Sequence, residues 1–287
     1  MNYDRWIETQ LTYTSLSIRG HRTGVWMTDS SKPLAILVHG ITGDFHGLVP
    51  LAHELAATHR IAIVELPGHG SSDEIADLTG RRLQKWFVEV VEKLAQMATR
   101  PEVIVAHSFG CLSVLHETIL TDFPVVLLNP VPTPSDTYNR YARSVIRSAR
   151  FWAFVYNWRV LIFFRTVALV KLRNKLSIRR VHWVGRTSKP EYHQVIYQAH
   201  LVDMILSKRN FVDIEDKVAL VMCGLYDTTA RQRDSFDFEA IFGRTPIVFI
   251  RGGHLLPIED PVRVAEVIQS VTAVSATLEI HGSVASQ

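Results

Sequence analysis

Short apolar runs alternate with amphipathic stretches along most of this 287-residue chain. The runs are rich in β-branched residues and lie at 34–38, 60–66, 102–106, 124–128, 218–223 and 245–250. Between them, apolar residues take helical spacing at 47–58, 80–98, about 109–120 and about 261–273. Strands that alternate with helices indicate crossover connections, so we expect a parallel sheet with helices on both faces. Burial on both faces accounts for the nearly unbroken hydrophobicity of the runs.

Polar, glycine-rich and titratable residues follow several of these predicted strands. They are His39-Gly40, Pro67 to Gly70, His107-Ser108, Asn129-Pro130, Asp227 and His254. Ligands of open parallel sheets bind beyond the carboxyl ends of the strands. We therefore expect the functional site at that edge of the sheet.

The segment AHSFG (106–110) follows one strand and precedes a helical pattern. Small residues, Ala106 and Gly110, flank Ser108 at minus two and plus two, where bulky side chains would collide with the adjoining strand and helix. This pattern is typical of a serine nucleophile on a sharp strand-to-helix turn. The alternative interpretation of Ser108 is a helix N-cap.

The segment HGITG (39–43) follows the first strand of the predicted parallel core. Acyl transfer builds negative charge on a carbonyl oxygen, and two backbone N–H groups can stabilise it. We expect the donors to be Ile41 N–H and Phe109 N–H, with Thr42 adding a hydroxyl. His39 is interpreted as a residue that orients this loop rather than as a proton carrier.

Asp227 and His254 each follow a predicted strand. A serine hydroxyl becomes a good nucleophile when an imidazole accepts its proton, and a carboxylate must orient that imidazole. The chain order Ser108, Asp227, His254 is the order expected for nucleophile-elbow hydrolases. Asp234 and Asp237 compete with Asp227 for the role of the carboxylate.

Five segments together resemble the α/β-hydrolase superfamily: HGITG, ELPGHGSSD, AHSFG, CGLYD and GGHLLPIEDP. The resemblance implies Ser108 as nucleophile, His254 as general base and acid, and Asp227 as its orienting partner. It also implies a mostly parallel, doubly wound sheet with a mainly helical cap inserted after the sixth strand. Residues 1–130 and 214–287 would form the core, and 131–213 the cap. A serine nucleophile argues against the branches of the superfamily that use an aspartate.

Charge sets the same middle segment apart. Residues 131–213 hold 15 Lys/Arg and 4 Asp/Glu, whereas the rest of the chain holds 16 Lys/Arg and 24 Asp/Glu. Helical spacing places Arg140, Arg143, Arg147 and Arg150 on one face of a helix. Such a face attracts an anionic substrate, for example an acyl-CoA or an acidic ester, or an anionic lipid surface. A solvated face or a dimer contact is the alternative.

The stretch 151–170 is long and apolar, but Asn157, Arg159 and Arg165 interrupt it. Because each central arginine is costly in a bilayer, we favour a cap that roofs an acyl pocket over a spanning helix. Docking at a membrane surface is the second possibility. We expect Thr42, His107 and unidentified cap residues to contact the substrate.

The sequence thus predicts a serine hydrolase that cleaves a carboxylic ester or thioester. Carbon–carbon bond hydrolysis, acyl transfer, lipase action at a membrane surface and ligand binding without turnover are the alternatives. The two cysteines, Cys111 and Cys223, have no metal-binding spacing, and we expect neither a metal nor an organic cofactor. A net charge of +3 does not indicate a nucleic-acid partner. The N-terminus has no secretory pattern, which favours the cytoplasm.

Overall fold

The computed structural model describes residues 2–98, 100–131, 175–188, 190–206, 217–227 and 241–284. Several predictions lie outside these ranges. They concern the arginines at 140–150, the apolar stretch 151–170, and Asp234 and Asp237. The described ranges hold the sheet, its helices and two helices of the middle segment.

Eight strands form one sheet, in the order β1-β2-β4-β3-β5-β6-β7-β8. Their bounds are β1 Leu11–Ile18, β2 His21–Thr28, β3 Leu34–Val38, β4 Arg60–Val64, β5 Pro101–His107, β6 Val125–Leu128, β7 Leu220–Gly224 and β8 Ile247–Ile250. The pairs β1–β2 and β2–β4 are antiparallel, and every pair from β4 to β8 is parallel. The predicted fold class, a mostly parallel doubly wound sheet, is confirmed.

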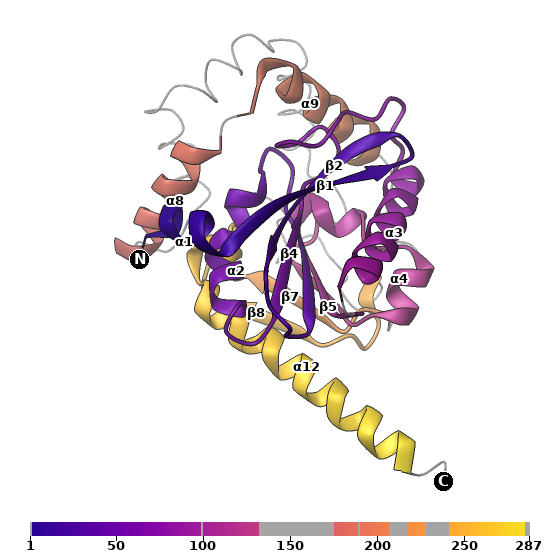
Figure 1. Ribbon diagram of the computed structural model, residues 1–287. Helices are drawn as coiled ribbons and strands as arrows, with labels where there is room; N and C mark the ends of the chain where they lie inside the picture. Colours follow the sequence, from indigo (N-terminus) through magenta and orange to yellow (C-terminus); the bar gives the residue numbers. More distant parts are fainter. Residues whose placement is uncertain are drawn as a thin grey trace.

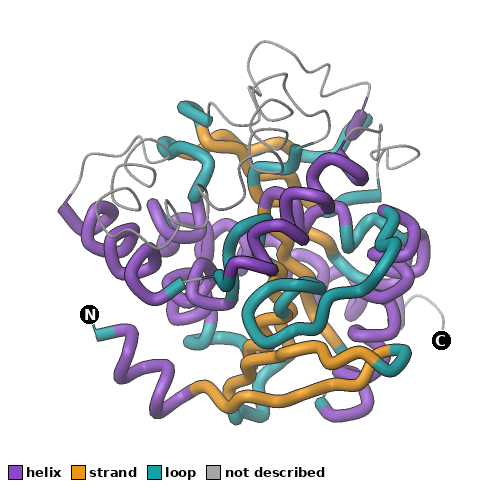
Figure 2. Tube along the Cα trace, turned by 90° about the horizontal axis from the view of Figure 1, so that it is seen from above, coloured by secondary structure: helices purple, strands orange, loops and turns teal. Residues whose placement is uncertain are grey.

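Helices cover both faces of the sheet (Figures 1 and 2). The helices are α1 Tyr3–Gln10, α2 Val49–Leu55, α3 Gly80–Met97, α4 Glu117–Asp122, α8 Lys175–Thr187, α9 Tyr192–Leu206, α11 Leu256–Glu259 and α12 Pro261–Val284. Two short 3₁₀ helices, η1 (Phe45–Leu48) and η2 (Ser108–Leu112), follow β3 and β5. Figure 1 shows α3 and α4 on one side of the sheet and α2 and α12 on the other.

Alternate residues of each central strand serve these two layers. Ile36 and Val38 of β3 pack in the core beneath α3, whereas Ala35 and Leu37 pack in the core beneath α2 and α12. All five residues of β3 are fully buried. Since successive side chains of a strand point to opposite faces, a strand covered on both sides must be apolar throughout. This explains why the central strands were visible in the sequence.

The expected helix at 109–120 is wrong as a continuous element. The chain forms η2, a turn, and then the separate helix α4. The Ser113 hydroxyl donates to the Gly110 carbonyl oxygen, and the His116 ring accepts from Thr118 N–H at the start of α4. Side chains that bond the local backbone in this way compete with helical hydrogen bonds, which accounts for the break. The last helix, expected at 261–273, instead continues to Val284.

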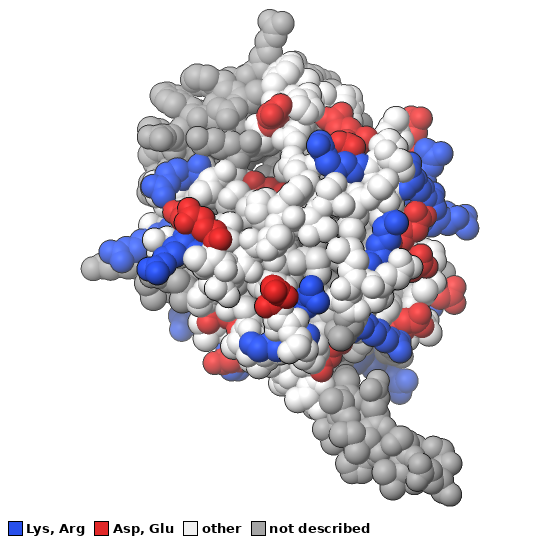
Figure 3. Space-filling view, viewed as in Figure 1, with Lys and Arg blue, Asp and Glu red and all other residues white. Residues whose placement is uncertain are grey.

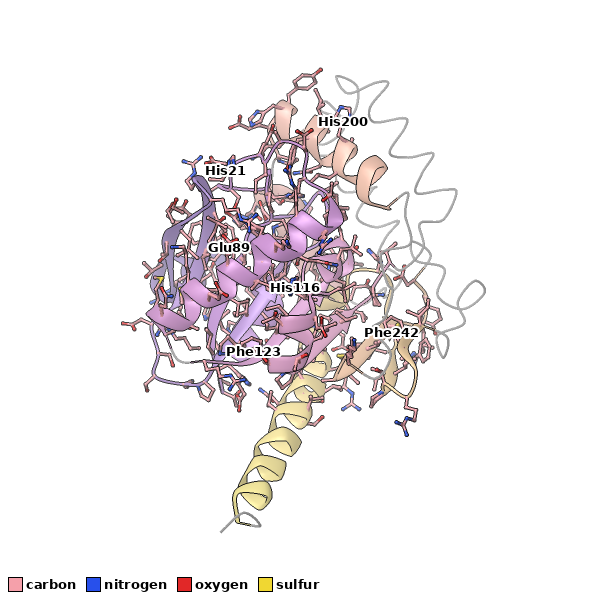
Figure 4. The ribbon with its side chains drawn as sticks, turned by 90° about the vertical axis from the view of Figure 1, so that its right-hand side faces the viewer. His21, Glu89, His116, Phe123, His200 and Phe242 are labelled. Carbon is pink, nitrogen blue, oxygen red and sulfur yellow. The ribbon has the colours of Figure 1, made fainter. Side chains whose placement is uncertain are left out.

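The middle segment follows β6, the sixth strand, and its described part is helical. Figure 4 shows α9, labelled at His200, at the end of the sheet opposite Phe123, which lies just before the start of β6. Hence α9 lies across the carboxyl ends of the parallel strands. Among the described helices, none is both long enough and apolar enough to cross a membrane.

Candidate active site

Ser108 sits on a sharp turn at the carboxyl end of β5. Its backbone has φ 53°, in the left-handed region that costs a non-glycine residue roughly 1–2 kcal/mol. Close packing enforces the turn: a Cβ at Gly110 would lie 2.4 Å from the His39 carbonyl oxygen, and one at Gly40 would lie 2.9 Å from Ser108 Cβ. The two glycines therefore allow the end of β3 and the turn after β5 to touch. Strain of this kind is characteristic of functional sites.

Three side chains from separate turns form a hydrogen-bonded chain. Ser108 Oγ lies 2.8 Å from His254 Nε2, and His254 Nδ1 lies 2.8 Å from Asp227 Oδ2. The exposed fractions of Ser108, Asp227 and His254 are 3%, 8% and 7%. Since the Asp227 carboxylate can only accept the hydrogen bond from His254 Nδ1, that nitrogen carries the proton, and the lone pair of Nε2 points at the serine hydroxyl. The arrangement can move a proton from Ser108 to His254.

Asn129, directly after β6, contacts the same carboxylate. Its Nδ2 donates to Asp227 Oδ2 at 2.6 Å and to the Gly253 carbonyl oxygen at 3.4 Å. The residue is fully buried and has φ 47°. Asn129 stood among the polar residues at the strand ends, but nothing in the sequence assigned it to Asp227.

Glu259 holds the loop that carries His254. Its carboxylate accepts from Gly253 N–H at 2.9 Å and from Leu255 N–H at 3.1 Å, the two amides on either side of His254. The side chain is 1% exposed. Sequence reasoning missed this residue as well, and its position five residues after His254 was the only signal.

His107 supports the same loop from β5. Its Nε2 lies 2.8 Å from the His254 carbonyl oxygen, so Nε2 carries the proton and donates it to that oxygen. Burial, followed by the neighbouring His254, lowers the pKa of His107 to about 3. The ring is therefore neutral at pH 7, and the described contact is with His254 itself.

The loop after β3 has its own ordered histidine. His39 Nε2 accepts from Leu66 N–H at 3.2 Å, so Nδ1 donates to the Gly40 carbonyl oxygen at 2.8 Å. Burial lowers the pKa of His39. This geometry agrees with a role in orienting the loop.

The two candidate oxyanion donors are the N–H groups of Phe109, the residue after Ser108, and of Ile41, in the loop after β3. Phe109 is buried and Ile41 is half-buried, and within the described ranges neither N–H donates to a backbone or side-chain acceptor. Thr42, next in the loop, has φ 62°. Gly40, directly before Ile41, packs against Ser108, directly before Phe109.

Helix α9 docks on the loop after β4 through three side chains. Tyr197 OH both accepts from Ile75 N–H and donates to its carbonyl oxygen, at 3.1 and 3.0 Å. Gln194 Nε2 donates to the Gly70 carbonyl oxygen at 2.9 Å, and Gln198 Nε2 donates to that of Gly68 at 3.2 Å. The i, i+3, i+4 spacing of the three side chains sets one face of α9 on this loop.

Helix α8 docks on the opposite flank of the site. Ser177 Oγ donates to the Glu259 carbonyl oxygen at 2.8 Å, and Arg180 donates to the same oxygen at 3.2 Å. Trp183 Nε1 donates to Asp4 Oδ1 of α1 at 2.8 Å. The middle segment thus contacts α11, the helix that follows His254, through α8, and the loop after β4 through α9.

Metal binding and thiol chemistry find little support in the described part of the chain. No group of three or more His, Cys, Asp or Glu side chains there is placed to hold a metal ion. Cys111 and Cys223 are both fully buried, and burial raises the pKa of each thiol. Protonated, inaccessible thiols are poor nucleophiles.

Charged side chains on the face shown in Figure 3 lie mostly toward its edges, and both signs are mixed. The described part of the middle segment holds only four of its 15 Lys/Arg: Lys175, Arg179, Arg180 and Arg186. The role expected for the basic charge of this segment therefore remains a prediction.

The chain is similar in sequence to known proteins over most of its length. The profile of the alpha/beta hydrolase family matches residues 35–267. The magnesium-chelatase 30 kDa subunit of Rhodobacter capsulatus is 29% identical over 106 residues, which cover 36% of this chain. The match spans 37% of the length of that relative, little more than a third.

Two solved structures share the fold over nearly their whole length. A thermophilic esterase from Thermogutta terrifontis, bound to malate, is 18% identical with a TM-score of 0.66, over 90% of this chain and 97% of that one. The enol-lactonase from Burkholderia xenovorans LB400 is 13% identical with a TM-score of 0.70, over 91% and 100%. At these identities the likeness concerns the fold alone.

Proposed function

Since this chain belongs to the alpha/beta hydrolase family, we propose that it is a serine hydrolase that cleaves a carboxylic ester or thioester. The observation that carries the proposal is the hydrogen-bonded chain from Ser108 through His254 to Asp227, with both distances at 2.8 Å. A serine bonded to a histidine that a buried carboxylate orients is the arrangement that activates a hydroxyl for attack.

In the first half of the reaction Ser108 Oγ attacks the acyl carbon while its proton passes to His254 Nε2. The imidazolium that forms lies beside Asp227, whose negative charge stabilises it. Collapse of the tetrahedral intermediate breaks the bond to the alcohol or thiol, which leaves with the proton from His254. The acyl group then remains on Ser108 as an ester.

Stabilisation of the oxyanion is the role we assign to Ile41 N–H and Phe109 N–H. Both belong to segments that touch at Gly40 and Ser108, and neither spends its hydrogen bond on a described acceptor. Donors that are already fixed in place stabilise the oxyanion most, because they need no reorganisation when charge develops. Removing one such donor typically raises the activation barrier by about 3–4 kcal/mol.

In the second half a water molecule takes the place of the leaving group. His254 Nε2 accepts a proton from this water as it attacks the acyl carbon, and then returns the proton to Ser108 Oγ. The acid product and the free enzyme result. No step requires a metal or a redox cofactor.

The middle segment is proposed as a cap over the acyl pocket. Support comes from α8 and α9, which dock on two sides of the site through Ser177 and Tyr197. We further propose that the basic charge of residues 131–213 favours an anionic substrate. Thr42 and His107 are kept as candidate substrate contacts, although the described bond of His107 to the His254 carbonyl indicates support of the loop.

The test is hydrolysis of 4-nitrophenyl esters and acyl thioesters of graded chain length by the wild type, Ser108→Ala and Ser113→Ala. Ser113 is the matched control, because it is equally buried but bonds only the Gly110 carbonyl oxygen. We expect Ser108→Ala to lower kcat at least about 1,000-fold and Ser113→Ala to leave kcat within a few-fold. Equal activity of Ser108→Ala and the wild type would overturn the proposal. Carbon–carbon hydrolysis and acyl transfer use the same residues, and product analysis with and without an acceptor alcohol distinguishes them.

A second candidate is a ligand-binding subunit that keeps the fold without turnover. The observation that favours it is the name of the relative from Rhodobacter capsulatus, which is called a subunit of a magnesium chelatase. This candidate predicts no hydrolysis by the wild type and no difference between the wild type and Ser108→Ala. Lipase action at a membrane surface predicts instead that activity rises with anionic vesicles.

A further inference from the structure

Asn129 holds an unusual position that the reaction above leaves without a role. It lies directly after β6, is fully buried, and has φ 47°. Its backbone N–H donates to the Met222 carbonyl oxygen of the neighbouring strand at 2.8 Å. Asparagine is one of the few non-glycine residues that adopt the left-handed region, but a buried asparagine must also satisfy its amide.

The side-chain amide of Asn129 donates two hydrogen bonds, one to Asp227 and one to the loop before His254. One goes to Asp227 Oδ2 at 2.6 Å, the other to the Gly253 carbonyl oxygen at 3.4 Å. The reversed orientation of the amide would place Oδ1 against the carboxylate oxygen, where two acceptors repel. Oδ1 itself finds no partner among the described residues. A buried acceptor without a hydrogen bond lowers the stability of the fold, so the benefit of Asn129 must come from the two hydrogen bonds that its amide donates.

Asp227 Oδ2 thus receives two hydrogen bonds, from Asn129 Nδ2 and from His254 Nδ1. We propose that Asn129 is a positioning residue: it fixes the carboxylate of Asp227 against His254 Nδ1 and ties both to the loop before His254. The inference rests on the proposed function and adds a fourth residue to the hydrogen-bonded chain. Asn129 does not touch the substrate and acts only through Asp227.

The chemistry explains why an amide suits this position. A donor bonded to a carboxylate favours its charged form, and the charge is what stabilises the imidazolium. A neutral donor does so without adding a second charge that would compete with His254. Without it, the carboxylate can rotate, and the tautomer of His254 is less firmly set.

The first test is Asn129→Gly, with Asp77→Gly as the control. Glycine prefers a positive φ, so Asn129→Gly removes the amide without straining the turn. Asp77 also has a positive φ (53°) but is exposed and lies in the loop before α3. We expect Asn129→Gly to lower kcat about 10- to 100-fold with KM within about twofold, and Asp77→Gly to leave both unchanged.

The second test is Asn129→Asp, which keeps the shape of the side chain and replaces the donor by a carboxyl group. The titratable groups nearest the change are Asp227, His254, His107, Cys223 and Glu259. Two adjacent carboxyl groups share one proton at lower pH, and the shared proton restores a donor to Asp227. At higher pH both ionise and repel. The ratio of wild-type to Asn129→Asp kcat should therefore rise between pH 6 and 9, whereas the ratio for Asn129→Gly should stay constant.

The outcomes separate this inference from the proposed function. Wild-type kcat in a folded Asn129→Gly variant, or a flat ratio for Asn129→Asp, would overturn the positioning role and leave Ser108 as the nucleophile. Full activity of Ser108→Ala would overturn the proposed function first. If Asn129→Gly fails to fold by circular dichroism, the pH ratio for Asn129→Asp decides alone.

Discussion

The two ends of the parallel sheet are built by different rules. At the amino ends, cations cap helix termini: Lys32 Nζ donates to the carbonyl oxygens of Ala56 and Ala57 after α2, and Arg100 donates to that of Asp122 at the end of α4. These contacts neutralise the negative ends of helices and stabilise the fold.

The carboxyl ends instead hold residues with a strained backbone, and several buried polar groups gather there. Thr42, Ser108 and Asn129 follow β3, β5 and β6 with positive φ. His69 and His107 are buried there in neutral form. Features that lower the stability of one end of a sheet persist when they serve a function. The comparison therefore predicts that substitutions at the carboxyl ends reduce activity, and that those at the amino ends affect only stability.

Among substitutions that leave Ser108 in place, the largest effect is expected for Gly110→Ala. The added Cβ would lie 2.4 Å from the His39 carbonyl oxygen, so the turn after β5 must move away from the loop after β3. We expect kcat to fall about 100-fold, because reacting groups tolerate little displacement, and stability to fall by about 1–3 kcal/mol. Gly47→Ala is the control, since nothing lies within 4 Å of its added Cβ. Urea unfolding and ester hydrolysis measure both quantities, and an active, stable Gly110→Ala would contradict the packing argument.

Two glutamates, one at each end of the sheet, allow a direct comparison of the two ends. Glu259 accepts from the amides of Gly253 and Leu255 around His254, whereas Glu102 lies 2.9 Å from the buried His59 at the amino ends. In Glu259→Gln the new amide group has donors that face these N–H groups, so the loop shifts and kcat should fall about tenfold. Glu102→Gln should leave kcat unchanged and alter stability by less than about 1 kcal/mol, because it is partly exposed. Equal kcat values for the two variants would remove the distinction between the ends.

The smallest effect concerns pH and stability. Burial lowers the pKa of His69 from 6.5 to about 3, so the unfolded chain binds a proton between these values that the folded chain does not. His69 should therefore not lower the free energy of unfolding well above pH 6.5, and should lower it progressively as the pH falls toward 3. The loss from His69 at pH 5 should be about 2 kcal/mol.

The matched variant is His69→Asn, whose amide can still donate to the Pro67 carbonyl oxygen, as His69 Nδ1 does at 2.9 Å. Between pH 7.5 and 5 the free energy of unfolding should fall in both proteins. The fall in the variant should be about 2 kcal/mol smaller than the fall in the wild type. The same slope in both proteins would show that His69 is protonated in the folded state at pH 5.

The sequence predicted the parts of the molecule that depend on local pattern. The central strands are largely apolar, and the turn residues Ser108, Asp227 and His254 follow the ends of strands within four residues. The hairpin β1–β2 was missed because it lies at one side of the sheet, where the edge strand β1 exposes half of its residues and has no unbroken apolar run. The role of Asn129 depends on a contact across 98 residues, which no local pattern reveals. Glu259 lies six residues from Gly253, but its short distance from His254 in the chain did not by itself identify the contact.

The central claim is that Ser108 is an activated nucleophile, and its most direct test is covalent labelling. The wild type, Ser108→Ala and Ser113→Ala would each be incubated with a fluorophosphonate and measured by intact-mass spectrometry. The account predicts one adduct per chain on the wild type and on Ser113→Ala, and none on Ser108→Ala. An adduct on Ser108→Ala, or none on the wild type, would contradict it.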